Sequence, residues 1–402
     1  MKQQELMKRL SKQTDSKIVF LVMDGIGGVQ HPDFGDVTAL EKAKRPNLDK
    51  LAKDGLCGFT DPIMPGITPG SGPAHAGLFG YNPLEIEIGR GLLDTLGIDF
   101  DFSPLDMAAR GNFAAIDDND IVTDRRAGRI STEECNRLCN LLSSIKIDGV
   151  EIFLKPVKEH RFSVIFRAQN LDDRLNDSDP QKTGLKPFNV ESADTGAQKT
   201  ADMVNEFIYK AKQVLKNEKP ANMILLRGFS KMINIEKYQD IYKLNPSAIA
   251  TYPMYRGLAK LAGMNVLPAG ETIESEFESL EKNFKDFDYF FIHIKKTDSY
   301  GEDGNFPSKV KIIEEVDKYL PKLTALNPDV IVVTGDHSTP ALLKGHSWHP
   351  VPTIIWSKVC RKDEVKKFNE TECIKGGLGR INAQSLMPIA MANAGKLMKF
   401  GA

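Results

Sequence analysis

Short runs of consecutive apolar residues, many of them β-branched, recur along the chain. Residues 17–23 form one such run, which ends at the glycine-rich segment 24–28. Two similar runs, 287–294 and 329–334, are also followed by polar residues and glycine. Runs of this length without polar alternation are typical of strands that are buried on both faces of a sheet. The pattern therefore predicts a buried parallel sheet.

Helical patterns lie between these apolar runs. Residues 46–54 start with proline and are followed by Gly55, which is the usual order of residues at the start and end of a helix. Residues 309–326 form a second helical pattern. Strands that alternate with helices predict an α/β fold, with helices covering both faces of the sheet.

The middle of the chain is organised differently. Arginine-rich turns and a polar loop at 172–187 accompany a long helical pattern at 197–217 and possible strands at 160–168 and 223–227. Because 402 residues exceed the roughly 250–300 that one core usually serves, we expect two domains. We interpret the middle segment as a smaller α/β unit inserted into the first. The predicted division is 1–106, 107–245 and 246–402, with the first and third segments forming one domain.

The overall charge excludes some classes of partner. Lys and Arg total 53 and Asp and Glu total 54, so no net field favours nucleic acid or an anionic membrane. The five cysteines are scattered without CxxC spacing, and no apolar stretch approaches the roughly 18 residues of a membrane span. We expect a cytoplasmic protein that binds a small molecule. The sequence does not determine its oligomeric state.

Acidic and imidazole side chains follow the three predicted strands. Asp24 follows the first strand, residues 297–303 follow the second, and residues 335–340 follow the third, with His346 a short turn later. Ligands bind outside the carboxyl ends of parallel strands, so these groups should meet at one edge of the sheet. Singly, each has an ordinary structural explanation, but together they suit two divalent cations that need oxygen and nitrogen ligands.

Ser71 lies between glycines in the segment 68–75 and precedes an apolar run. A serine at the start of a helix is favourably placed for an alkoxide or a phosphate ester, because backbone N–H groups and the helix dipole favour negative charge there. The alternative is an ordinary helix-capping serine. A neighbouring metal site favours the nucleophile, because coordination activates a hydroxyl.

Arginine is concentrated in the middle segment, with three arginines among the five residues 125–129. Guanidinium groups suit forked recognition of phosphate and carboxylate, whereas surface ion pairs are the alternative. The candidate substrate-binding residues are Arg110, Arg125, Arg126, Arg129, His160, Arg161 and Arg227. The third glycine of the dinucleotide fingerprint and the P-loop motif are both absent, so a nucleotide-dependent enzyme is disfavoured.

Several motifs occur in a fixed order along the chain. They are Asp24-Gly25-x-Gly27, Thr38-Ala39-Leu40-Glu41, Pro46-Asn47-Leu48-Asp49, Pro69-Gly70-Ser71 with His75, Leu78-Phe79-Gly80-Tyr81-Asn82-Pro83, Gly89-Arg90-Gly91, Asp124-Arg125-Arg126-Ala127-Gly128-Arg129 and Thr334-Gly335-Asp336-His337-Ser338-Thr339-Pro340. This set resembles the archaeal-type cofactor-independent phosphoglycerate mutases of the alkaline phosphatase superfamily. The resemblance implies an α/β, alkaline-phosphatase-like core whose inserted domain is a substrate-orienting cap.

The resemblance also implies an isomerase of glycolysis and gluconeogenesis that interconverts 3-phosphoglycerate and 2-phosphoglycerate. Ser71 corresponds to the serine that is transiently phosphorylated. The implied ligands are Asp24, Ser71, Asp336 and His337 for one metal, and Asp298, Glu302 and His346 for the other. Mn²⁺ or Mg²⁺ is favoured, with Zn²⁺ or Co²⁺ as alternatives, and neither a nucleotide nor bisphosphoglycerate is required.

Two positions depart from the family pattern. Glu302 stands where the family has histidine, and His349 stands where the family has aspartate. Either Glu302 binds the second metal through oxygen or His349 supplies a nitrogen instead. The alternative functions are a phosphatase or another phosphotransferase on the same scaffold, and a catalytically silent metal-binding protein.

Overall fold

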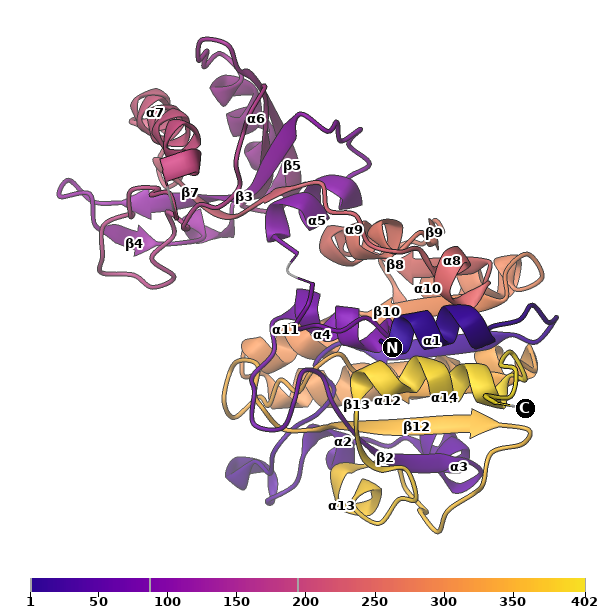
Figure 1. The fold of residues 1–402 in the computed structure, drawn as a ribbon. Coiled ribbons are helices and arrows are strands. Elements are labelled where there is room, and N and C mark those ends of the chain that lie inside the picture. Colours follow the sequence, from indigo (N-terminus) through magenta and orange to yellow (C-terminus); the bar gives the residue numbers. More distant parts are fainter. Residues whose placement is uncertain (1, 87, 194, 402) are drawn as a thin grey trace. The chain divides into compact units, whose positions relative to one another are not determined.

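The computed structural model describes residues 2–86, 88–193 and 195–401. The chain divides into two compact units, which Figure 1 shows. Unit 1 comprises Met1–Glu87 and Ile235–Ala402, and unit 2 comprises Ile88–Asn234. The insertion was predicted at 107–245, whereas unit 2 starts and ends earlier in the chain. The earlier start has a structural reason, because helix α5 (Arg90–Gly97) packs on the strands of unit 2.

Unit 1 contains the predicted parallel strands and the helices between them. Its elements are α1 (Gln3–Leu10), β1 (Ile18–Met23), α2 (Ala39–Lys42), α3 (Pro46–Lys53), β2 (Leu56–Asp61), α4 (Ser71–Leu78), α8 (Tyr238–Tyr242), β8 (Pro246–Ala250), α9 (Pro253–Leu261), β9 (Asn265–Val266), α10 (Ile273–Asn283), β10 (Tyr289–Ile294), α11 (Lys296–Glu302), α12 (Phe306–Ala325), β11 (Val330–Thr334), β12 (Val351–Ser357), α13 (Glu370–Cys373), β13 (Gly379–Asn382) and α14 (Leu386–Asn393). The described residues form an eight-stranded sheet in the order β13-β2-β12-β11-β1-β10-β8-β9.

The centre of this sheet is parallel. Strand β1 lies between β10 and β11, with Ile18 opposite both Tyr289 and Val330. All six residues of β1 are fully buried, because the sheet is covered on both faces. The predicted α/β class with a parallel core is confirmed. Among the described strands of this sheet, β12 runs antiparallel to both of its neighbours, β11 and β2.

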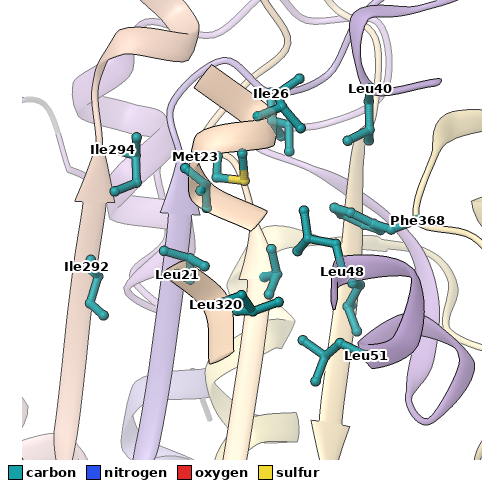
Figure 2. Packing of buried hydrophobic residues seen from close by; sticks show 14 of the residues in the cluster. Leu21, Met23, Ile26, Leu40, Leu48, Leu51, Ile292, Ile294, Leu320 and Phe368 are labelled. Carbon is teal, nitrogen blue, oxygen red and sulfur yellow. The ribbon is translucent and has the colours of Figure 1, made fainter. Parts of the chain in front are cut away.

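One face of the sheet packs against an aliphatic layer. Figure 2 shows Leu21 of β1 and Ile292 of β10 beside Leu320 of α12, and all three are fully buried. Residues of α3 and α10 belong to the same cluster. Burying an aliphatic side chain of this size contributes about 1.5–3 kcal/mol, so this layer is a main source of stability for unit 1.

The opposite face carries aromatic rings. Phe291 and His293 alternate with Ile292 along β10, and the ring of His75 on α4 lies 5.7 Å and 5.1 Å from them, between centroids. The ring centroid of Tyr255 on α9 lies 3.7 Å from that of His293. These contacts hold α4, which begins at Ser71, against the sheet.

Unit 2 is an α/β unit whose sheet is antiparallel. Besides α5 it contains β3 (Asp106–Ile116), β4 (Val122–Asp124), α6 (Thr132–Leu142), β5 (Glu151–Lys158), β6 (Arg161–Arg167), α7 (Gln198–Leu215) and β7 (Met223–Lys231). In the described residues the sheet has the order β4-β3-β6-β5, and β7 pairs with the long strand β3. One face packs on α6 and α7, and Arg110 and Ser163 point from the other face toward α5.

Candidate active site

The predicted ligands emerge at one edge of the sheet of unit 1. Asp24 directly follows β1, Asp298 lies in the first turn of α11 after β10, and Asp336 follows β11. Because these strands are parallel, their carboxyl ends are neighbours. The antiparallel strand β12 starts at the same edge, so the loop that holds His346 also lies there.

Two groups of side chains in the described part of the chain have the composition of a metal site. The first contains Asp24, Asp336 and His337, and the second contains Asp298, His337 and His346. Within each group, one ligand atom from every residue lies within 4.8 Å of the others. His337 belongs to both groups, so the two candidate sites are adjacent.

The histidine tautomers suit metal binding. His346 Nδ1 lies 2.9 Å from the carbonyl oxygen of Pro69, which can only accept, so Nδ1 carries the proton. Thr339 Oγ1 donates to Asp298 Oδ1 at 2.6 Å and therefore accepts from His337 Nδ1 at 3.0 Å. Both imidazoles thus present Nε2, the atom that would bind a cation.

Buried polar atoms without hydrogen-bond partners converge at the first group. They are Asp24 Oδ1, Asp336 Oδ2 and His337 Nε2. His337 Nε2 lies 3.3 Å from Asp24 Oδ1 and 3.1 Å from Asp336 Oδ2. Unsatisfied buried oxygens and nitrogens are costly, and a divalent cation would satisfy all three. The residues therefore fit a metal site.

The charges around the site favour ionised carboxylates. Burial raises the pKa of Asp24, but Lys295, His293 and His337 outweigh this effect and hold its pKa well below the usual value. Burial lowers the pKa of His337, but Asp336 and Asp24 raise it to about 9. A surplus of negative charge thus surrounds the imidazole of His337, as expected where a cation binds.

Ser71 is brought to both groups by contacts of its own helix and loop. It is the first residue of α4 and only 4% exposed. One turn later, His75 Nδ1 lies 2.8 Å from the Ser71 carbonyl oxygen and 3.3 Å from Asp336 Oδ2. On the other side, Pro69 contacts His346. The start of α4 is therefore joined to a ligand of each group.

Glu302 lies outside both groups, and so does His349. Asp298 and Glu302 were predicted to face the same ion, and in the structure Asp298 is buried whereas Glu302 is exposed. The face of α11 that carries Asp298 continues at Gly301. Gly301 packs so closely on Thr339 that a Cβ on Gly301 would lie 2.3 Å from the carbonyl oxygen of Thr339. This packing turns Glu302 toward solvent.

Two of the candidate arginines in unit 2 are held by buried carboxylates. Arg110 makes a forked ion pair with Asp94, in which Nη2 lies 2.8 Å from Oδ1. Arg125 makes a similar pair with Asp179, with donor–acceptor distances of 2.9 and 2.6 Å. Arg227 Nη1 lies 4.0 Å from Asp179. Burial, followed by repulsion from Arg90 and Arg110, lowers the pKa of Arg227 to about 10.

The other candidates gather around His160, which is buried. Burial lowers the pKa of His160 to about 3, and the positive charges of Arg161, Arg126 and Arg129 act in the same direction. Its Nδ1 has no hydrogen-bond partner. Arg126 and Arg129 are exposed, so this cluster combines accessible cations with a neutral imidazole.

Comparison with known proteins identifies the family. The family model for 2,3-bisphosphoglycerate-independent phosphoglycerate mutase matches residues 52–222. A probable 2,3-bisphosphoglycerate-independent phosphoglycerate mutase of Thermosipho africanus is 54% identical over 401 residues, which are 99% of each chain. The chain belongs to this mutase family. A protein of Thermotoga maritima with the same description is 51% identical over 99% of both chains.

Two solved structures share the fold of this chain. A protein of Pyrococcus horikoshii is 30% identical, with a TM-score of 0.83 over 97% of this chain and 100% of its own. A cofactor-independent phosphoglycerate mutase of Thermoplasma acidophilum is also 30% identical, with a TM-score of 0.68 over 94% of this chain and 100% of its own. No helix in the described part of the chain is long and apolar enough to cross a membrane.

Sequence reasoning missed several residues that surround the two candidate metal groups. Lys295 Nζ lies 2.9 Å from Asp24 Oδ2 and 2.5 Å from Asp298 Oδ2. Tyr255 donates a hydrogen bond of 2.6 Å to Asp24 Oδ2, and His293 Nε2 lies 3.3 Å from the same oxygen. His293 is a polar residue inside the predicted strand at 287–294, and Lys295 is the first residue after it, so a search for polar residues within and directly after that apolar run would have found both. The sequence around Tyr255 contains no comparable signal.

Proposed function

We propose that this chain interconverts 3-phosphoglycerate and 2-phosphoglycerate through a phosphoserine at Ser71, without bisphosphoglycerate. The observation that carries the proposal is the attachment of the Ser71 segment to both candidate metal groups, through His75 to Asp336 and through Pro69 to His346. Cations bound to these groups would be close enough to activate a hydroxyl at the start of α4, and the chain belongs to the mutase family.

The proposed ligands are Asp24, Asp336 and His337, with Ser71, for one ion, and Asp298 and His346 for the other. Bound divalent cations would supply Lewis-acid activation of the hydroxyl and neutralise charge on the phosphoryl group. Ser71 Oγ forms a bond to phosphorus while the bond to O3 of the substrate breaks. The backbone N–H groups at the start of α4 stabilise the resulting phosphate ester. The 2-hydroxyl of the retained glycerate then takes the phosphoryl group from Ser71.

Unit 2 supplies the groups that retain glycerate in this proposal. A mutase must keep its substrate between two phosphoryl transfers, so positioning of the glycerate carboxylate is part of the mechanism. The cluster of Arg126, Arg129, Arg161 and His160 fits this role, because charged donors surround an imidazole that stays neutral.

A direct assay tests the function. Purified full-length protein with Mn²⁺ and 3-phosphoglycerate, and no bisphosphoglycerate, should form 2-phosphoglycerate, detected by coupling to enolase. Mg²⁺, Co²⁺ and Zn²⁺ are tested in parallel. Release of inorganic phosphate as the main product would identify a phosphatase instead. No reaction with any of the four cations would favour a silent metal-binding protein.

Alanine substitutions in unit 2 should separate the two sets of arginines. Arg126→Ala and Arg129→Ala should each lower kcat/KM. The loss should correspond to about 1.5–3 kcal/mol of transition-state binding, the range for hydrogen bonds to charged groups. Arg125→Ala should mainly lower stability, because the fully buried side chain of Asp179 loses its forked partner. Steady-state kinetics and thermal unfolding measure the two effects.

Arg137 provides the control for this set. It is a half-exposed arginine of the same unit whose guanidinium contacts Glu134 and Glu218. Arg137→Ala should leave kcat/KM unchanged. Unchanged kinetics in Arg126→Ala and Arg129→Ala as well would make these arginines surface ion-pair residues and remove them from the substrate site.

A further inference from the structure

Lys309 of α12 is fully buried among backbone carbonyls. Its Nζ lies 2.6 Å from the carbonyl oxygen of Gly25, 2.7 Å from that of Thr339 and 3.4 Å from that of Gly27. An ammonium group can donate three hydrogen bonds, and here three carbonyl oxygens accept them. Taking such a charge out of water costs several kcal/mol, so these contacts are needed to offset its burial.

The carbonyls belong to the two loops that carry metal ligands. Gly25 directly follows Asp24, and its N–H donates to Asp336 Oδ1 at 3.2 Å. Thr339 holds Asp298 and His337 through its hydroxyl. Its N–H lies 3.2 Å from the Gly25 carbonyl oxygen and 3.1 Å from that of Gly27. Lys309 therefore joins the loop after β1 to the loop after β11 at the residues that orient the ligands.

The two loops leave little room for another arrangement. Gly25 has a φ of 64°, and a Cβ at this position would lie 2.5 Å from Thr339 Oγ1. Glu370 of α13 holds the same loop from another side, because it accepts a 3.0 Å hydrogen bond from the N–H of Gly28. The loop after β1 is thus held at two places. Glu370 accepts a hydrogen bond from the N–H of Gly28, and Lys309 donates to the carbonyl oxygens of Gly25 and Gly27.

We propose that Lys309 is a positioning residue for the metal groups. Its ammonium holds Gly25 and Thr339 together, and this contact sets the spacing of Asp24, Asp298 and His337. The proposal rests on the proposed function in one respect, namely that these groups bind divalent cations. Lys309 itself contacts backbone carbonyls and binds neither the cations nor the substrate.

The test compares two buried lysines of unit 1. Lys396 is also fully buried, and its Nζ lies 2.7 Å from the Thr14 carbonyl oxygen and 3.2 Å from Asp288 Oδ2. Asp288 immediately precedes β10, so Lys396 lies at the opposite edge of the sheet from the metal groups. Lys309→Met and Lys396→Met therefore remove the same charge from equally buried positions.

Mn²⁺ binding to full-length protein stripped with a chelator is measured by calorimetry, together with the thermal unfolding midpoint. Both variants should unfold at lower temperature than the wild type. Only Lys309→Met should bind Mn²⁺ at least tenfold more weakly, as expected when the support of metal ligands is lost. Mn²⁺ affinity within threefold of wild type in Lys309→Met, or an equal loss in Lys396→Met, would overturn the proposal.

A second variant serves if Lys309→Met does not fold. Lys309→Gln keeps a neutral donor amide that is one bond shorter than lysine, and it should bind Mn²⁺ more weakly than the wild type, whereas wild-type affinity would overturn the proposal. Failure of the wild-type chain to bind Mn²⁺ would instead contradict the proposed metal site. Failure of the mutase assay with normal Mn²⁺ binding would contradict the proposed function and leave the role of Lys309 intact.

Discussion

Ser71→Ala is expected to abolish phosphoglycerate turnover, with a loss on the order of 10⁴-fold or more, the scale seen when a covalent nucleophile is removed. Ser71 has the required setting, because it begins α4 and its segment contacts a residue of each metal group. The loss should therefore be in kcat and should not be recovered at high substrate concentration.

The fold should survive this substitution. The Ser71 side chain is small, and alanine is at least as favourable as serine in a helix. Ser247→Ala is the matched control, because Ser247 is a fully buried serine of unit 1 that donates a 3.0 Å hydrogen bond to the carbonyl oxygen of Tyr289, at the start of β10. That variant should keep its turnover.

Mass spectrometry of acid-quenched reactions adds a second measurement. A phosphorylated peptide containing Ser71 should be found in the wild-type protein and in Ser247→Ala, and should be absent from Ser71→Ala. Retention of a tenth of the wild-type rate by Ser71→Ala would rule out the phosphoserine mechanism.

His337→Ala should weaken the binding of both metal ions. His337 belongs to both candidate groups, so its imidazole is a shared element of the two sites. Loss of Nε2 removes a ligand from the group of Asp24 and Asp336. Loss of Nδ1 frees Thr339, whose hydroxyl holds Asp298 of the other group. We expect Mn²⁺ affinity to fall at least about 100-fold, the upper end of the range for a lost supporting residue.

Single-group variants and an outside carboxylate show whether the effect is specific. His346→Gln should weaken the binding of one ion and leave the binding of the other unchanged. Calorimetry and metal analysis detect this as a change in stoichiometry. Glu302→Gln should leave both unchanged, because Glu302 is exposed and lies outside the groups. Two ions bound at wild-type affinity in His337→Ala would refute the assignment of the groups. A large loss in Glu302→Gln would restore the ligand predicted from sequence.

The sequence by itself determined the layout of unit 1 and much of its chemistry. The apolar runs at 17–23, 287–294 and 329–334 correspond to β1, β10 and β11, because a strand buried on both faces cannot alternate with polar residues. From these strands it followed that Asp24, Asp298 and Asp336 would be neighbours, since the carboxyl ends of parallel strands share an edge. This reasoning needs only the order of apolar and polar residues along the chain.

Only the tertiary structure decided how the remaining side chains are used. Glu302 follows Asp298 by four residues, yet close packing of Gly301 on Thr339 turns Glu302 outward. The sequence does not distinguish Arg110 and Arg125 from Arg126 as substrate-binding candidates. In the structure, Asp94 and Asp179 form ion pairs with the first two from other parts of unit 2. In the sequence, Lys309 is an ordinary lysine of a helical pattern. Only the structure shows that three carbonyl oxygens from two loops surround its ammonium group. These outcomes depend on contacts between residues far apart in the chain, and local sequence patterns contain no record of which distant groups will meet.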